Sequence, residues 1–314
     1  MKHSANGHGL VTIAADGMIL DTWYPSPSLG KPESDSTPAE VQAAERHDDL
    51  RAVDIKAIST VIDCDEPPAT VPDAYLRLHL LSHRLVQPNG INLDGLYSVL
   101  PNVVWTAHGP ASPATIEETR TRFRVAGLHL VIHGVDKFPR MVDYVVPQGV
   151  RIADADRVRL GAHLAEGTTV MHEGFINFNA GTLGVSMIEG RLAQGVVVGD
   201  GSDVGGGAST MGTLSGGGKE RVSLGRRSLL GANAGLGIAL GDDCIVESGL
   251  YLTAGSKVLV LNDLGDDGNP RVVKARELSG CNGVLFRRNS LTGALEAVHR
   301  EGPGVTLNAT LHGN

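Results

Sequence analysis

One glutamate stands directly before the most glycine-rich part of the chain. Glu189, in the segment SMIEGR, precedes a stretch from Gly195 to Gly241 whose glycines leave backbone N–H groups accessible. A carboxylate can accept the proton of an attacking amine, and a backbone N–H can stabilise the oxyanion of a tetrahedral intermediate. These residue types therefore favour acyl transfer, although an acidic residue at a turn is most often only solvated.

The segment MGTLSGGGKE, residues 211–220, has the glycines and the lysine of a phosphate-binding loop. A Walker loop needs Gly, four residues and then Gly-Lys-Ser/Thr, so that backbone N–H groups surround the phosphates. Here the residue five positions before Gly218 is Thr213, and the lysine is followed by Glu220 instead of a hydroxyl residue. The neighbouring glycines do not form the dinucleotide pattern G-x-G-x-x-G either. The loop must therefore serve another chemistry.

Basic residues gather in the last third of a chain whose formal net charge is -8. They are Lys257, Lys274, Arg276, Arg287 and Arg288. Arginine suits bidentate contact with phosphate, so an anionic ligand such as coenzyme A is one interpretation and ordinary surface charge is the other. The net negative charge argues against nonspecific binding to nucleic acid or to an anionic membrane, so we expect neither partner.

A six-residue repeat of aliphatic residues is the element that must position these groups. Its members are Val146, Ile152, Val158, Leu164, Val170 and Ile176, then Ile188 after a lapse at Thr182, and in a later frame Leu240, Val246, Leu252 and Val258. This period is neither 3.6 nor 2, so it favours a hexapeptide parallel β-helix, in which each hexapeptide forms one side of a triangular prism. About 18 residues would then complete one coil. The narrow interior suits a chain with only 4% aromatic residues.

A glycine-rich, doubly wound α/β domain is the alternative fold. Its helices would repeat every 3.6 residues, and no such period occurs between Val146 and Gly255. The segment MGTLSGGGKE interrupts the six-residue count, so we predict a loop extruded from one corner of the prism. Loops on a rigid scaffold are where binding and catalytic residues tend to lie.

The whole chain is predicted to be mainly β and to have three parts. These are an N-terminal α/β domain over residues 1–127, the β-helix over residues 128–262 and a small C-terminal β segment over residues 263–314. The C-terminal segment would also cover the open end of the prism, which otherwise exposes unpaired strand edges.

The N-terminal part has a strong helix pattern at residues 73–86. Asp73 can cap this helix, and Leu78, Leu81 and Leu85 share one face. A second helix is expected at TIEETRTRF, followed by a strand at LHLVIHGV, while the acidic stretch from residue 31 to residue 49 is expected to be a mobile loop.

Two pairs of residues suggest metal ligands. Asp156 and Glu173 are nearly one coil apart, so their carboxylates could lie on the same side of the prism, and such hard oxygens suit magnesium or calcium. Solvated surface acids are the alternative interpretation. His163 and His172 suggest zinc, but no third histidine follows within the repeat, so zinc is not favoured.

The cysteines and the N-terminus indicate a compartment. Cys64, Cys244 and Cys281 form neither a C-x-x-C zinc pattern nor an even-numbered disulfide set, and Cys244 is expected to pack inside the prism. The segment MKHSANGHGLVTIAADG has no sustained apolar run, and nowhere do 18 apolar residues run together. We therefore expect a cytoplasmic protein.

A family resemblance is strongest at residues 136–184, DKFPRMVDYVVPQGVRIADADRVRLGAHLAEGTTVMHEGFINFNAGTLG. This stretch resembles the tetrahydrodipicolinate N-succinyltransferase family, in its longer-chain actinobacterial branch. The likeness extends to YLRLHLLSHRLV, NVVWT, GDGSDVGGGAS, MGTLSGGG, KARELSG and LFRRNS. It thus covers most of the chain beyond the first seventy or so residues, and motifs of this length are highly specific.

The resemblance implies a homotrimer of left-handed parallel β-helices with active sites between neighbouring subunits. It also implies a reaction, in which succinyl-CoA donates succinyl to the amine of hydrated, ring-opened tetrahydrodipicolinate. The products are N-succinyl-2-amino-6-oxopimelate and CoA, on the diaminopimelate route to lysine. Glu189 matches the family's catalytic carboxylate, which acts as a base or as a transient anhydride. Gly212 matches the glycine whose N–H stabilises the oxyanion, and Asp156 and Glu173 match a magnesium pair at the three-fold axis.

The same matching implies a set of contacts to succinyl-CoA. They are Arg191, Gly206, Ser209, Ala232, Glu247, Ser248, Gly255, Lys274, Arg287, Arg288, Asn289 and Ser290. The chain departs from the family where Ser248 replaces an alanine and Thr210 replaces a larger aliphatic residue, and neither change removes a catalytic group. The insertion LNDLGDDGNP lengthens the link before Lys274, which makes the position of that lysine the least secure.

Two other functions remain open. One is a hexapeptide-repeat acyltransferase that uses acetyl-CoA or another amine acceptor. The other is a non-catalytic β-helix that serves as a binding module, for which an unbroken prism would be expected. The interrupted repeat and Glu189 argue against the second.

Overall fold

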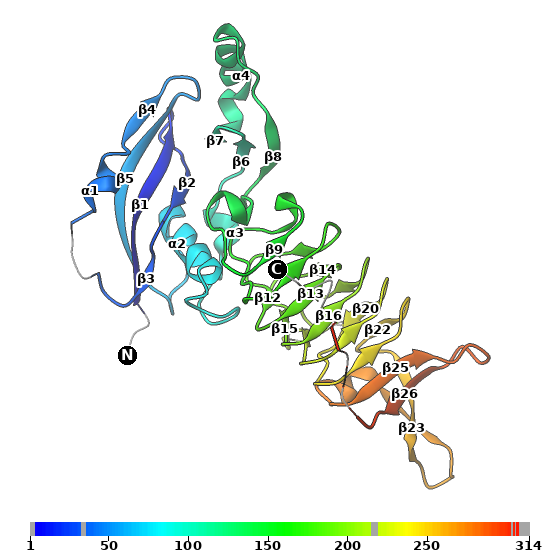
Figure 1. Ribbon diagram of the computed structural model, residues 1–314. Coiled ribbons are helices and arrows are strands. Elements are labelled where there is room, and N and C mark those ends of the chain that lie inside the picture. Colours follow the sequence, from blue (N-terminus) through cyan, green and yellow to red (C-terminus); the bar gives the residue numbers. More distant parts are fainter. Residues whose placement is uncertain (1–3, 33–35, 215–218, 303, 305, 308–314) are drawn as a thin grey trace. The chain divides into compact units, whose positions relative to one another are not determined.

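The structure is a computed structural model that describes residues 4–32, 36–214, 219–302, 304 and 306–307 (Figure 1). The chain forms two units, Met1–Val146 with Arg159–Gly161, and Pro147–Val158 with Ala162–Asn314. The domain limits predicted at residues 127 and 262 stay predictions; residues 128–146 lie in the first unit. No helix of the described residues is long and apolar enough to cross a membrane.

An antiparallel sheet forms the first layer of unit one. Its order is β2 (Ile19–Trp23), β1 (Ser4–Ala14), β5 (Val53–Asp63) and β4 (Arg46–Asp48), with β3 (Ser28–Leu29) also paired to β1. The two longest strands, β1 and β5, pair along their whole length from Ser4↔Asp63 to Ala14↔Val53. The stretch from residue 31 to residue 49, expected to be a loop, holds β4 and the short helix α1 (Ala39–Gln42), while residues 33–35 lie outside the described part.

The helix α2 (Val71–Ser82) packs against this sheet. It begins earlier than expected because the hydroxyl of Thr70, and not Asp73, caps it by accepting a hydrogen bond from the Asp73 backbone N–H at 3.3 Å. It ends before Leu85, because Arg84 adopts a left-handed φ of 61° that turns the chain away. Leu78 and Leu81 are buried as predicted, whereas Leu85 is exposed.

A smaller three-stranded sheet completes unit one, in the order β7 (Gly109–Ala111), β6 (Val103–Thr106) and β8 (Ile132–Asp136). The helix expected at TIEETRTRF is α4 (Ile116–Val125), and β8 begins four residues later than the expected strand at 128–135. Single helical turns accompany them: α3 (Leu96–Val99), η1 (Pro113–Thr115) and η2 (Met141–Asp143).

Unit two is a parallel β-helix with three sides. The first side contains β9 (Arg151–Ile152), β10 (Thr169–Val170), β13 (Ser186–Ile188), β16 (Ser202–Val204), β19 (Leu229–Leu230) and β21 (Ile245–Val246). The second contains β11 (Phe175–Ile176), β14 (Arg191–Leu192), β17 (Ser209–Thr210), β20 (Gly235–Gly237) and β22 (Tyr251–Thr253). The third contains β12 (Gly181–Thr182), β15 (Val197–Val198) and β18 (Ser223–Leu224), and η3 (Ala155–Arg157) follows β9. The predicted hexapeptide β-helix is therefore present.

The length of a coil varies, and this explains the lapses in the repeat. The pair Val170↔Ile188 spans 18 residues, but Ile176↔Leu192 spans 16. After Ile188 the next residue that faces the interior is Leu192, four positions later instead of six. This shorter step shortens the coil and changes the frame of the repeat. Thr182 keeps an inward position, because its buried hydroxyl bonds the hydroxyl of Thr168 at 2.6 Å. Val146 was assigned wrongly to the repeat: it is 78% exposed.

The segment MGTLSGGGKE leaves the prism between β17 on the second side and β18 on the third side. The pair Val198↔Leu224 spans 26 residues, so this coil holds eight to ten residues more than its neighbours. The extra residues contain the segment, which confirms that it interrupts the coil. Residues 215–218 of the segment lie outside the described part of the chain.

The C-terminal strands extend the first side of the prism. They are β23 (Lys257–Leu264), β24 (Pro270–Lys274), β25 (Val284–Arg288) and β26 (Leu295–His299), with η4 (Ala275–Leu278) between the two hairpins. Strand β25 pairs in parallel with β21, so it continues the sheet beyond the last coil. The insertion LNDLGDDGNP forms the tip of the β23–β24 hairpin.

Candidate active site

The chain turns from the first to the second side at a corner that recurs on successive coils. We call this turn the first corner; its residues are Glu189–Gly190, Gly205–Gly206, Gly231–Ala232 and Glu247–Ser248. Backbone bonds from Glu189 N–H to Val204, and from Gly205 N–H to Leu230, hold the coils together at 2.8 Å. A Cβ at Gly205 would lie 2.7 Å from the Ala232 nitrogen, so only glycine allows coils to stack this closely.

Glu189 is half-buried at the first corner. One of its carboxylate oxygens lies near Gly206, since a Cβ added there would be 3.8 Å from Glu189 Oε2. Gly206 and the Glu189 carboxylate are therefore neighbours at this corner. The backbone N–H of Glu189 is bonded to the next coil, so the chain holds its Cα in place while the side chain projects outward.

A second carboxyl group, Asp203, lies beside Glu189 and was missed by sequence reasoning. It is the outward-facing middle residue of β16, between the buried Ser202 and Val204. Burial, and then the negative charge of Glu189, raise the pKa of Asp203 to about 6. The sequence shows only that Asp203 stands between two residues that face the interior. This pattern does not reveal that Glu189 of the neighbouring coil lies beside it.

Gly212 lies at the far end of the second side. A Cβ at this position would be 3.0 Å from the Gln194 carbonyl oxygen, so Gly212 stacks on Gln194 of the preceding coil. Its carbonyl accepts a bond from Val222 N–H at 3.2 Å, but no described residue accepts a bond from its own N–H. No described residue thus competes with a ligand for this N–H, as the role of an oxyanion donor requires.

Glu189 and Gly212 are not opposite one another within the chain. Glu189 begins the second side and Gln194, on which Gly212 stacks, ends it. The two positions are five residue steps apart, which is a span of about 16 Å for extended chain at 3.3 Å per residue. Within a single chain the two groups therefore lie too far apart to act on the same pair of reacting atoms.

The residues expected to contact succinyl-CoA lie along the second side and its two corners. Gly206, Ala232, Glu247 and Ser248 occupy the first corner, and Arg191 and Ser209 are paired on the second side itself. Gly255 follows β22 at the far corner, and Lys274 lies near it because Ala275 N–H bonds the Ser256 carbonyl at 2.8 Å. The fold thus gathers on one surface residues that are far apart in the sequence.

The run Arg287–Ser290 continues the first corner beyond the last coil. The Glu247 carboxylate accepts a bond from Arg288 N–H at 2.7 Å. Arg287 pairs with Glu296 at 2.9 Å, and Asn289 donates to the same carboxylate at 2.8 Å. These bonds from Asn289 and Arg287 lower the pKa of Glu296. Part of the basic charge expected for an anionic ligand is therefore already neutralised.

Asp156 and Glu173 are both exposed on adjacent coils. The bridge between Val158 and Ile176 aligns Asp156 with residue 174, which directly follows Glu173. The carboxylates of Asp156 and Glu173 therefore lie at the same turn of the prism. Within the described part of the chain, no group of three or more His, Cys, Asp or Glu is placed to hold a metal. His163 is buried, with Nδ1 3.0 Å from the Thr182 carbonyl, and Cys244 is buried as predicted.

Known proteins resemble this chain over its full length. A protein of Vibrio cholerae named 2,3,4,5-tetrahydropyridine-2,6-dicarboxylate N-succinyltransferase is 49% identical, with 100% of each chain covered. One of the same name from Salinispora tropica is 60% identical over 99% of this chain and 98% of its own. The family model for the tetrahydrodipicolinate N-succinyltransferase middle matches residues 100–140, and that for the hexapeptide repeat of succinyl-transferase matches residues 221–254.

Among the solved structures that resemble the fold, one covers nearly the whole chain. It is a Campylobacter jejuni protein provisionally described as a 2,3,4,5-tetrahydropyridine-2-carboxylate N-succinyltransferase. It is 30% identical with a TM-score of 0.78, and the match covers 95% of this chain and 92% of that one.

Proposed function

Because the chain belongs to the tetrahydrodipicolinate N-succinyltransferase family, we propose that Glu189 and Gly212 carry out its reaction. The protein is a CoA-dependent acyltransferase that moves succinyl from succinyl-CoA to tetrahydrodipicolinate, in the diaminopimelate route to lysine. The observation that best supports the catalytic assignment is the N–H of Gly212, which has no acceptor among the described residues although the neighbouring coil packs closely against it.

The reaction joins an amine to a thioester carbonyl. The nitrogen of the ring-opened acceptor attacks the succinyl carbonyl carbon, and Glu189 accepts the proton that this nitrogen loses. The N–H of Gly212 stabilises the carbonyl oxygen as it becomes negative. When the intermediate collapses, the C–S bond breaks and the CoA sulfur leaves with the proton from Glu189. This direct route needs fewer steps than a transient anhydride on Glu189.

The working site lies between two copies of the chain. The separation of Glu189 from Gly212 along the second side supports this, because a glutamate from one prism can face a glycine from its neighbour. A three-sided prism also suits a homotrimer, in which each copy uses one side to meet the next. We also assign the β-helix a left-handed twist, because the family resemblance implies it.

Succinyl-CoA lies along the second side in this assignment. Arg191, Gly206, Ser209, Ala232, Glu247, Ser248, Gly255, Lys274, Arg287, Arg288, Asn289 and Ser290 would contact it. The exposed backbone at the first corner suits the long pantetheine arm, which bonds to peptide groups. The cations of the C-terminal strands suit its phosphates, which favour arginine and lysine.

Magnesium is assigned to the axis of the trimer. Asp156 and Glu173 offer hard oxygen ligands on adjacent coils, and both are exposed. A single chain supplies too few ligands, but a three-fold axis would bring three such pairs together. The cation would then neutralise carboxylates that otherwise repel one another, which is a structural role.

Release of CoA thiol tests the function. Purified protein is mixed with tetrahydrodipicolinate and either succinyl-CoA or acetyl-CoA, and the free thiol is measured over time. Faster release with succinyl-CoA is expected. A preference for acetyl-CoA would contradict the donor, and no release with either would favour the binding module considered above.

A further inference from the structure

Tyr251 is the last member of an outward-facing column on the second side of the prism. Ser209 pairs with Gly235, which in turn pairs with Tyr251 on the next coil. Arg191 pairs with Ser209 on the preceding coil. The neighbouring Leu252 faces the interior and is fully buried, whereas Tyr251 is 51% exposed. The column therefore begins among the residues proposed to contact succinyl-CoA and ends at an exposed aromatic ring.

The ring of Tyr251 lies over Gly235. A Cβ added at Gly235 would be 2.2 Å from Cδ2 and from Cε2 of the ring, so only glycine lets the ring approach the backbone there. Gly235 is itself buried. One part of the ring therefore rests on the prism, and the rest of its surface is exposed. An aromatic ring held in this way offers a planar group a surface on which to stack.

Three cations follow Tyr251 along the chain, and we call Lys257, Lys274 and Arg276 the cationic cluster. Lys257 and Lys274 lie directly opposite each other in the β23–β24 pair, and all three side chains are exposed. Like charges in such a pair repel each other. Within the described part of the chain, no carboxylate forms an ion pair with a member of the cluster. The carboxylate of Glu277 instead accepts a bond from the Lys274 backbone N–H at 3.0 Å. A bound anion would therefore relieve a repulsion.

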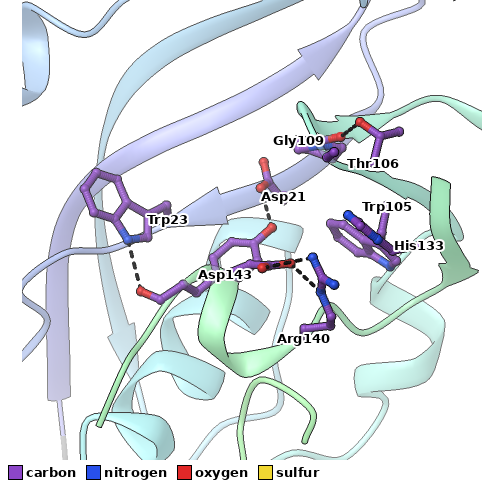
Figure 2. Close-up of a pocket in the computed structure, with 11 residues that line it drawn as sticks. Asp21, Trp23, Trp105, Thr106, Gly109, His133, Arg140 and Asp143 are labelled. Carbon is purple, nitrogen blue, oxygen red and sulfur yellow. Dashed lines mark hydrogen bonds and ion pairs between the residues drawn. The ribbon is translucent and has the colours of Figure 1, made fainter. Parts of the chain in front are cut away.

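Two other cations show the contrast, because each is paired within the chain. Arg140, which lines a cavity in unit one, forms two bonds with the Asp143 carboxylate, at 2.9 Å and 3.2 Å (Figure 2). On the β23–β24 hairpin itself, Arg271 pairs with Asp263 at 3.1 Å. The cationic cluster differs in that its charge is left for a ligand.

The cationic cluster lies at the end of β22, the strand that carries Tyr251. The backbone N–H of Arg276 bonds the Ala254 carbonyl at 3.1 Å, and that of Ala275 bonds the Ser256 carbonyl at 2.8 Å. Three residue steps separate Tyr251 from Ala254, which is about 10 Å of extended chain. A nucleotide can span this distance, with its base on the ring and its phosphates at the cations.

We propose that Tyr251 recognises the nucleotide end of the CoA ester, whose adenine stacks on the tyrosine ring while its phosphates contact the cationic cluster. This inference rests on the function proposed above, because it concerns the same donor. Stacking on an aromatic side chain is favourable for every base, and lysine and arginine are favourable partners of phosphate. None of the contacts named above for succinyl-CoA supplies an aromatic ring.

Isothermal titration calorimetry of the full-length protein tests the stacking directly. The ligands are CoA and its nucleotide fragment, adenosine 3′,5′-bisphosphate. In Tyr251→Ala the Kd of both should rise at least about fivefold, whereas Tyr251→Phe keeps the ring and should stay within about twofold of the wild type. Tyr97→Ala in unit one is the matched control, because Tyr97 is 49% exposed, and it should bind as the wild type does. An unchanged Kd in Tyr251→Ala, or an equal rise in Tyr251→Phe, would overturn the proposal.

A second variant tests the cations and keeps the proposal testable if Tyr251→Ala does not fold. Lys257→Gln removes one charge and should raise the Kd of the bisphosphate about threefold. Lys56→Gln, at an exposed position of β5, makes the same chemical change and should leave this Kd unaltered. The same Kd in Lys257→Gln and in the wild type would contradict the phosphate contact.

Thiol release separates this inference from the proposed function. Succinyl-pantetheine lacks the nucleotide end of succinyl-CoA. The ratio of kcat/KM for succinyl-CoA to kcat/KM for succinyl-pantetheine should therefore fall at least about fivefold in Tyr251→Ala, through KM. An equal loss with both donors would indicate a general effect on the fold and overturn the proposal. If neither donor released thiol in the wild type, the proposed function would fail, while calorimetry with the bisphosphate would still decide whether Tyr251 binds a nucleotide.

Discussion

Asp203 lies one residue before Val204, whose carbonyl accepts the hydrogen bond of the Glu189 backbone N–H, and the charge of Glu189 helps to raise the pKa of Asp203 to about 6. Two carboxyl groups on adjacent coils are therefore electrostatically coupled. Because the pKa of Asp203 is raised, this group gains its negative charge near pH 6 instead of near pH 4. The electrostatic field that Asp203 exerts at Glu189 therefore changes over the same pH interval.

The first prediction concerns this coupling. The rate of succinyl transfer by the wild-type protein should show an inflection near pH 6, and Asp203→Asn should lose it, since asparagine does not titrate. The measurement is kcat/KM from about pH 5 to pH 8. Asp266→Asn, at an exposed position of the β23–β24 hairpin, is the matched control and should keep the inflection. If the wild type and Asp203→Asn gave the same pH profile of kcat/KM, the charge of Asp203 would have no effect on the reaction rate.

The second prediction concerns Glu189. Glu189→Gln preserves the shape of the side chain but removes its ability to accept a proton, so kcat should fall about 10²–10⁴-fold. Thiol release measures the rate, and size-exclusion chromatography checks that assembly is unchanged. Turnover at the wild-type rate in a correctly assembled variant would remove the catalytic assignment.

The third prediction concerns Gly212. In Gly212→Ala the new methyl group would lie 3.0 Å from the Gln194 carbonyl oxygen, which displaces the backbone N–H from the oxyanion. We expect kcat to fall about 10²–10³-fold, the range found when one oxyanion donor is lost. Gly134→Ala is the control, because its methyl group would meet no atom within 4 Å. A similar loss in both variants would point to a general effect on folding.

The fourth prediction concerns a buried serine in the prism. Ser228 Oγ donates to the Gly241 carbonyl at 2.9 Å and accepts from Cys244 N–H at 3.0 Å. Ser228→Ala leaves both backbone groups unmatched and should lower the free energy of unfolding by about 1–3 kcal/mol. Denaturant unfolding measures the change, and the exposed Ser98→Ala should show none.

The fifth prediction concerns magnesium. If the metal lies at the trimer axis, the double variant Asp156→Asn/Glu173→Gln should purify without it, because amide oxygens are weaker ligands than carboxylates. Elemental analysis of protein dialysed against magnesium measures the content. An unchanged content in the variant would contradict the assignment of the metal to this pair.

The side-chain pattern decided much of the fold by itself. An aliphatic residue every six positions must face a narrow interior, and this is a local property of each hexapeptide, so Val158, Leu164 and Val170 could be placed inside without knowledge of the rest. The same holds for MGTLSGGGKE, which could be recognised as an insertion because it interrupts the count. Glu189 and Gly212 were chosen from residue type and family resemblance.

Only the tertiary structure decided which residues are neighbours on different coils. The number of residues per coil changes from 18 to 16 to 26, and each change shifts what lies alongside a given position. Asp203 beside Glu189, and Gly212 stacked on Gln194, follow from those lengths and from no local pattern.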